Sequence, residues 1–223
     1  MNYVDLENYA TFKGFFRRKG SIENKIIENV EFDKFNFVDV RNLEKVVFRN
    51  CKSKQNQLNF HLGCRIREMT LDKFKCSHVK IYWDSVDIQN LQVIGKGIRF
   101  LDAVPVSEGR RRKTTFEEPG LFLDISNAKD LCLNLIGLSS DAVKIDPELH
   151  YCLDFSKLSD EEGQYSGQAL SSIALRDAIW RLQNHKTHVG VFEKPHLNSK
   201  GNQSFDEDFA YLSSQGCLKE NIH

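Results

Sequence analysis

Aspartates recur at a near-constant spacing in the middle of the chain, and a row of carboxylates is an arrangement that can do chemistry. Asp84, Asp102 and Asp124 each follow a short apolar run, and Asp39 and Asp146 extend the series. Aligned carboxylates would serve as general acid and base or bind a cation. The competing interpretation is structural, because an aspartate that ends a strand accepts hydrogen bonds from the N–H groups of the next turn. We favour the turn role, since like charges stacked about 5 Å apart repel one another.

A second set of residues has the side chains that bind zinc. His61 and Cys64, followed by Cys76 and His78, place two histidines and two cysteines close together in the sequence. The spacings His-x2-Cys and Cys-x-His differ from those of usual ligand pairs, and the two pairs fall in successive repeat units. A zinc site formed by these four residues therefore stays an alternative, and the prediction is that the chain has no cofactor.

A basic stretch interrupts the chain at 104–120, within "VPVSEGRRRKTTFEEPG". Insertions in repeat proteins become loops on one face, and such loops often carry function. Alternation along "KIYW" places Ile81 and Trp83 inward and leaves Tyr82 outside. The favoured interpretation of this stretch is a solvated surface loop, and its functional alternative is a loop that docks on an acidic partner surface. For that function the predicted partner-binding residues are Arg110, Arg111, Arg112, Lys113 and Tyr82.

These candidate residues would be positioned by an internal repeat of about 22 residues. Successive copies start at positions 39, 62, 84, 102, 124 and 146, with spacings of 23, 22, 18, 22 and 22 residues. Apolar residues alternate within the copies, as at Val143 and Ile145, with the period of a strand. A unit of this length buries its apolar face only by stacking on its neighbours. We therefore expect a mainly β repeat solenoid of about six coils.

The repeat resembles two known architectures. "LEKVVFRNC" at 43–51 is similar to the leucine-rich repeat, whereas 66–74 and 88–96 lack the asparagine of that pattern. Nearly every unit has a second apolar run, which favours a parallel β-helix-like solenoid over the leucine-rich-repeat-like horseshoe. Resemblance to β-solenoid polysaccharide lyases and hydrolases implies an alternative function, a carbohydrate-active enzyme whose carboxylates are among Asp84, Asp102 and Asp124.

Three segments are expected along the chain. Residues 1–20 form a helical N-terminal cap, because the aromatic and apolar residues of 4–18 have helical spacing. Residues 21–158 form the solenoid, with a loop insertion at 104–120. Residues 159–223 form a C-terminal cap with helices and a strand.

Within the C-terminal cap, "ALSSIALRDAIWRLQNH" at 169–185 predicts a helix. "HVGVF" at 188–192 predicts a strand, and a short helix is expected around 205–212. The residues expected on one face of the first helix are Leu170, Ile173, Ala174, Ala178 and Leu182.

Composition narrows the classes of function. Thirty-one basic and 31 acidic residues give a net charge of zero, which makes a nucleic-acid partner unlikely on electrostatic grounds. No apolar run approaches the ~18 residues of a membrane-spanning helix, and the start of the chain has no predicted signal peptide. Six cysteines without a CxxC pair indicate a reducing, cytoplasmic location.

No motif of a nucleophile elbow, a phosphate loop or a dinucleotide site occurs. The leading hypothesis is therefore a non-enzymatic protein–protein interaction module, which binds another protein through the solenoid face and the basic loop. In general style the chain resembles bacterial inhibitor or immunity proteins, which implies an intracellular protein partner.

Overall fold

The structure, a computed structural model, describes residues 15–16, 22–32, 35–37, 43–54, 56–60, 64–105, 120–195 and 199–219. They belong to two compact units, one ending at Cys132 and the other beginning at Leu133. The first unit is a parallel β-solenoid, and the second combines antiparallel strands with two helices.

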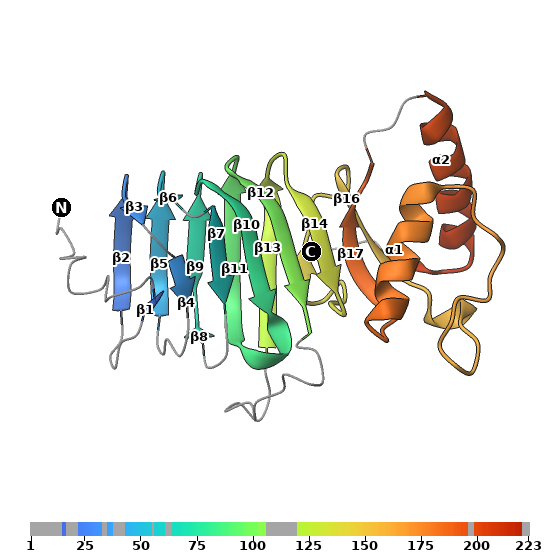
Figure 1. Cartoon of the computed structure of the whole chain (residues 1–223), viewed down its shortest axis with the longest axis horizontal. Coiled ribbons are helices and arrows are strands. Elements are labelled where there is room, and N and C mark those ends of the chain that lie inside the picture. Colours follow the sequence, from blue (N-terminus) through green and yellow to red (C-terminus); the bar gives the residue numbers. More distant parts are fainter. Residues whose placement is uncertain are drawn as a thin grey trace. The chain divides into compact units, whose positions relative to one another are not determined.

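The strands of sheet 1, in the first unit, lie side by side across Figure 1. All its strand pairs are parallel, and β9 pairs with both β5 and β11. Its strands are β2 (Ile22–Glu28), β5 (Leu43–Arg49), β8 (Arg65–Ile66), β9 (Met69–Asp72), β11 (Asp87–Gly95) and β13 (Gly120–Ala128).

Sheet 2 of the first unit is also parallel. Its strands are β1 (Phe15–Phe16), β4 (Phe35–Phe37), β7 (Gln57–Phe60), β10 (Cys76–Tyr82) and β12 (Ile98–Val104). Two short strands, β3 (Glu31–Phe32) and β6 (Lys52–Ser53), form a third parallel pair. A one-turn 3-10 helix, η2 (Trp83–Ser85), follows β10.

The predicted β-solenoid is confirmed, with about four turns of about 22 residues. The leucine-rich-repeat-like alternative is wrong, because each coil adds a parallel strand to a second sheet. The count of six coils is also wrong. Position 84 precedes β11 and position 102 lies within β12, the two strands of a single coil, and the copy at 146 leads into β16 (His150–Asp154), which pairs antiparallel.

Inward-facing side chains form apolar rows across the strands. Val46, Met69, Leu91 and Leu123 are register partners on successive strands of sheet 1, and all four are buried. Each such burial stabilises the fold by roughly 1.5–3 kcal/mol. In sheet 2 the corresponding buried side chains include Leu58, Phe60, Val79, Ile81, Leu101 and Ala103.

The second unit packs helices with an antiparallel sheet. Strand β17 (Val189–Glu193) pairs antiparallel with both β14 (Cys132–Ile136) and β16, and β18 (Leu218–Lys219) pairs antiparallel with β16. Its other elements are β15 (Val143–Lys144), η4 (Ser156–Leu158), α1 (Ile173–Asn184) and α2 (Ser199–Ser214). The predicted helix at 169–185, the strand at 188–192 and the helix around 205–212 are confirmed.

The buried face of α1 agrees only in part with the predicted one, since Leu170, Ala178 and Leu182 are buried as expected. Leu175, Ala178, Ile179 and Leu182 are buried, whereas Ile173 is 76% exposed. The helix begins after Ser172, whose side chain accepts a hydrogen bond from the N–H of Leu175. Periodicity alone placed the apolar stripe about a quarter of a turn from the side chains that are buried.

At the N-terminus, Phe15 and Phe16 form β1 and pair with β4, so this end of the helix predicted over 4–18 is a strand. The rest of that prediction lies outside the described residues. The predicted domain boundaries near 20 and 158 stay predictions. Among the described helices, none has the length and apolar character needed to cross a membrane.

Candidate protein-interaction site

The outward side of sheet 2 carries a cluster of aromatic and charged side chains. Because neighbouring residues on a strand point to opposite faces, the positions between the buried ones face outward. They are half-buried or exposed, and Phe100 and Asp102 of β12 lie beside His78 and Lys80 of β10. We call this surface the sheet 2 face: Gln57, Asn59, His78, Lys80, Tyr82, Phe100 and Asp102, with the exposed Arg99, whose guanidinium lies over the Phe100 ring.

His78 joins two residues of the neighbouring strand. Its imidazole stacks on the ring of Phe100, with centroids 4.9 Å apart and an interplanar angle of 21°. Its Nε2 also lies 3.2 Å from Oδ2 of Asp102. The guanidinium of Arg99 lies 5.1 Å from the centroid of Phe100, on the same ring. These contacts hold two rings and two charged groups in one arrangement.

Lys80 and Tyr82 form a second contact on the same face. The ammonium of Lys80 lies 5.3 Å from the centroid of the Tyr82 ring, a cation–π distance. Tyr82 is the register partner of Val104, the last residue of β12. The basic segment 110–113 follows this end of β12 along the chain, and it lies outside the described residues.

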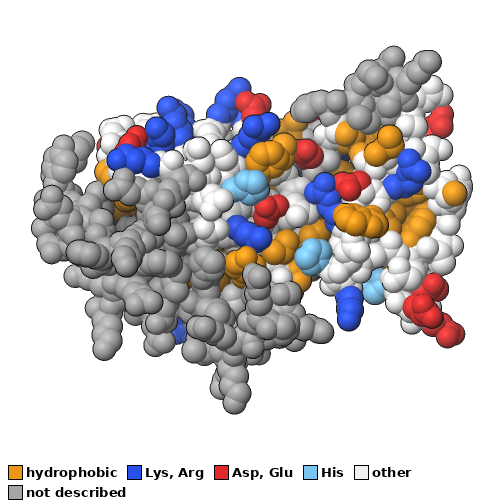
Figure 2. Space-filling model, in the orientation of Figure 1, with side chains coloured by type: hydrophobic (Ala, Val, Ile, Leu, Met, Phe, Trp, Pro, Cys, Tyr) orange, Lys and Arg blue, Asp and Glu red, His pale blue; other side chains and the backbone are white. Residues whose placement is uncertain are grey.

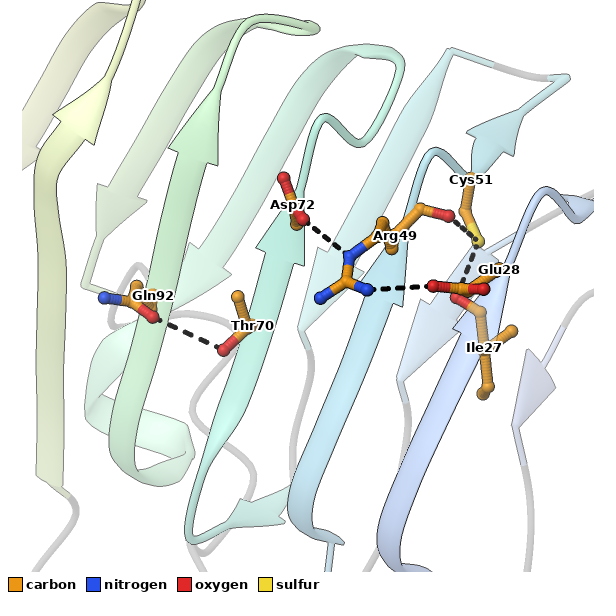
Figure 3. Close-up of polar contacts among 7 residues, drawn as sticks. All are labelled: Ile27, Glu28, Arg49, Cys51, Thr70, Asp72 and Gln92. Carbon is orange, nitrogen blue, oxygen red and sulfur yellow. Dashed lines mark hydrogen bonds and ion pairs between the residues drawn. The ribbon is translucent and has the colours of Figure 1, made fainter. Parts of the chain in front are cut away.

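The outward side of sheet 1 has a different character. Arg49 lies between two carboxylates of the neighbouring strands, as Figure 3 shows. Its Nη1 is 2.9 Å from Oε1 of Glu28, and its Nε is 2.8 Å from Oδ2 of Asp72. These residues are register partners 21 and 23 positions apart in the chain. Charges of alternating sign therefore cross three strands.

A second polar row crosses sheet 1. Thr70 Oγ1 donates to Oε1 of Gln92 at 3.5 Å, and Gln92 Nε2 donates to Oδ2 of Asp124 at 3.3 Å. The other carboxylate oxygen of Asp124 accepts from both the N–H and the hydroxyl of Ser126. Further cross-strand ion pairs join Arg65 to Asp87 and Arg67 to Glu44. We call the surface that carries these two rows and ion pairs the sheet 1 face; its charged side chains named here contact one another across strands.

The structure separates the three aspartates considered for catalysis. Asp84 lies in η2, Asp102 lies on the sheet 2 face, and Asp124 lies on the sheet 1 face. Their register partners differ, since Asp102 pairs with Lys80 and Asp124 pairs with Gln92. No shared row of carboxylates results among these three positions.

Two described aspartates of the series, Asp124 and Asp146, accept the N–H of the residue two positions on, and Asp146 does so at the start of a turn. Asp146 lies in a turn, and its Oδ1 accepts a hydrogen bond from the N–H of Glu148 at 2.9 Å. Asp102 and Asp124 lie within strands instead. The even spacing of the aspartates was misleading, because neighbouring strands are not always the same number of residues apart. Thr70 and Gln92, on neighbouring strands, are 22 residues apart, whereas Gln92 and Asp124, also on neighbouring strands, are 32 apart because the insertion lies between them. The 22 residues from Asp102 to Asp124 lead from one sheet to the other.

The residues considered for zinc have other surroundings. Cys64 and Cys76 are buried, and burial raises the pKa of the Cys76 thiol to about 12. That shift disfavours the thiolate that binds metal. His78 belongs to the sheet 2 face, and His61 lies outside the described residues. Across the described parts of the chain, no group of three or more His, Cys, Asp or Glu side chains is arranged to hold a metal ion.

Of the predicted partner-binding residues, Tyr82 lies on the sheet 2 face, and Arg110 to Lys113 lie outside the described residues. Sequence reasoning missed Lys80, Arg99 and Phe100, and it considered His78 only as a metal ligand. Alternation with the buried Val79 and Ile81 was the signal that places His78 and Lys80 outward. On the face shown in Figure 2, basic, acidic and hydrophobic side chains of the described residues are interspersed.

The chain matches no family model, and neither a curated protein nor a solved structure matches it.

Proposed function

We propose that the chain is a non-enzymatic protein-binding module that binds an acidic protein partner through the sheet 2 face. The observation that carries this proposal is a cluster of ring contacts. His78 and Arg99 both contact the ring of Phe100, and Lys80 contacts the ring of Tyr82. Tyr and Arg are the residue types enriched in protein interfaces.

Electrostatics supports an acidic partner. The sheet 2 face carries two permanent cations, Lys80 and Arg99, and a histidine, against the carboxylate of Asp102. The basic segment Arg110–Lys113, close to β12 in the chain, adds charge of the same sign. Complementary charge steers association and excludes partners of the wrong sign.

Rigidity supports binding in another way. The outward side chains project from parallel strands whose inward side chains are buried. The ring contacts hold several of the outward side chains in place. A surface ordered before binding loses less conformational entropy when the partner arrives.

In the inhibitor or immunity-type form of this proposal, the bound protein is active and binding blocks its activity. A cytoplasmic location stays a prediction. The carbohydrate-active alternative has no specific observation in its favour, because Asp84, Asp102 and Asp124 lie on three different elements.

The test compares single charge reversals of exposed or half-buried cations in the first unit. Tagged wild-type protein captures its partner from native lysate at moderate salt, and mass spectrometry identifies a stoichiometric protein. The purified partner is then titrated calorimetrically against Lys80→Glu, Arg99→Glu and the matched control Lys129→Glu. We expect the dissociation constant to rise about tenfold or more for the first two variants, and to stay unchanged for Lys129→Glu.

Circular dichroism verifies that all three variants are folded. Equal dissociation constants for the three variants would remove the sheet 2 face from the proposal. Failure to recover any stoichiometric protein, or a partner without an acidic surface, would contradict the proposed function itself.

A further inference from the structure

A buried histidine in the second unit has an unusual environment. His150, the first residue of β16, is 4% exposed, and its Nδ1 has no hydrogen-bond partner. The backbone N–H of His150 donates to the carbonyl of Asp146 at 2.9 Å. Protonation of the ring would add an N–H donor inside the protein without an acceptor, which costs free energy.

A lysine beside this histidine connects three parts of the unit. The Lys194 backbone N–H donates to the carbonyl of Leu149, and its ammonium donates to the carbonyl of Pro147, both at 2.7 Å. The same ammonium lies 5.5 Å from the centroid of the Phe209 ring on α2. Lys194 therefore connects the end of β17, the turn before β16 and α2.

Aromatic packing completes the junction with α2. The Tyr151 ring, next to His150 on β16, contacts the rings of Phe205 and Phe209 on α2, with centroids 6.0 and 5.6 Å apart. The phenylalanine rings of α2 do not titrate, so they cannot themselves make this junction sensitive to pH.

Few charged groups act on the imidazole. Asp146 lies in the turn before β16, Lys194 follows β17, and Glu193 of β17 is the register partner of His150. Burial, and secondarily Lys194, lower the pKa of His150, whereas Asp146 opposes the shift. The folded state therefore holds fewer protons than the unfolded state. The stability that depends on the neutral ring is complete above the ordinary pKa of 6.5 and is lost as the pH falls below it.

We propose that His150 and Lys194 form an acid-sensitive latch that holds α2 and the 146–149 turn against β16 and β17. In mild acid the protonated imidazole adds an N–H donor without an acceptor in the protein interior, directly after the turn that Lys194 holds, and the positive charge of Lys194 opposes the new charge. The contacts of Lys194 with Pro147 and Phe209 then break, and α2 separates locally from the sheet while the solenoid stays folded.

Hydrogen exchange of the full chain at pH 7.5 and pH 5.0, corrected for intrinsic rates, tests the latch. In the wild type we expect the protection of peptides from α2 and the 146–149 turn to fall several-fold at pH 5.0. Peptides from β9 and β11 should keep their protection. His150→Phe, which stays neutral, should abolish the fall in α2, and the matched control His185→Asn, at an exposed position after α1, should retain it.

Lys194→Met gives an independent measurement if His150→Phe does not fold. It removes the positive charge of Lys194 and the clamp, so α2 protection should already be lower at pH 7.5 and should change less at pH 5.0. Equal α2 protection at both pH values in the wild type would overturn the latch. The same would follow from an unchanged response in His150→Phe, or from a loss of protection that includes the solenoid strands equally.

Discussion

The outward faces of sheets 1 and 2 belong to one solenoid, yet their side chains make different contacts. On the sheet 1 face, Arg49 lies between Glu28 and Asp72, and Gln92 lies between Thr70 and Asp124. On the sheet 2 face, the corresponding contacts involve aromatic rings. The same repeat thus yields one face on which charged and polar side chains pair across neighbouring strands and another on which rings and cations lie together.

The difference is confined to the outward positions, so the inward positions of both sheets should be equally important for stability. Leu71 of sheet 1 and Leu101 of sheet 2 are both fully buried. We expect Leu71→Ala and Leu101→Ala each to lower the free energy of unfolding by about 2–5 kcal/mol. Urea unfolding followed by circular dichroism measures both, and a cost below ~1 kcal/mol at either position would break the symmetry.

The corner that joins the two sheets should be nearly as sensitive. Gly97, between β11 and β12, has φ of +137°, and a Cβ there would lie 2.5 Å from the carbonyl oxygen of Phe74. Gly97→Ala should therefore cost about 1–3 kcal/mol or more. Gly120→Ala is the control, because among the described residues its Cβ would meet Asp87 Oδ1 at 3.9 Å, an ordinary contact distance. Equal thermal midpoints for the two variants would contradict the strained corner.

Partner binding should distinguish the two faces. Tyr82→Ala removes a ring from the sheet 2 face, and we expect about a tenfold weaker affinity for the captured partner. Thr70→Ala changes an outward position of the sheet 1 face and should leave the affinity unchanged. Calorimetric titration of both variants measures this, and an equal loss would show that binding does not discriminate between the faces.

A charge reversal should lower stability more on the sheet 1 face than on the sheet 2 face. Arg49→Glu places three carboxylates in one row across β2, β5 and β9, so it should lower the thermal midpoint more than Arg99→Glu does. Because the pairs are partly exposed, added salt should reduce the difference. Scanning calorimetry at low and high salt is the measurement, and affinity for the partner should stay unchanged in Arg49→Glu.

The smallest effect concerns the thiols beneath the two faces. Burial raises the pKa of both Cys51 and Cys76, so both thiols stay protonated near neutral pH. At pH 8 a thiol reagent should modify half-buried Cys132 well before either of them. Mass spectrometry of the partially modified native protein gives the order, and early modification of Cys76 would indicate that the core of sheet 2 opens.

The local sequence pattern was enough to predict the elements whose apolar residues alternate without interruption. The strands that contain Val46 and Phe48, or Val79 and Ile81, have a period of two, and their repetition predicts a solenoid because isolated units cannot bury one face. The helix at 169–185 was also predictable, although its buried side was predicted only in part. Contact with the core placed Leu175 and Ile179 inside and left Ile173 exposed.

The candidate site was less predictable, because it depends on which strands lie side by side. His78 and Phe100 are 22 positions apart, and nothing in either strand alone indicates that their rings stack. Asp102 and Asp124 have the same spacing but lie on different sheets, since the coil between them contains the insertion. Strand register, not sequence distance, decides which side chains meet.

The sequence by itself determined that this chain forms a β-solenoid followed by helices, because alternation and repeat length dictate which residues must be buried. Only the tertiary structure decided the number of coils, the partners of each aspartate and the different character of the two faces. Those properties arise between strands about 22 residues apart, where the hydrogen-bond register sets one side chain against the next.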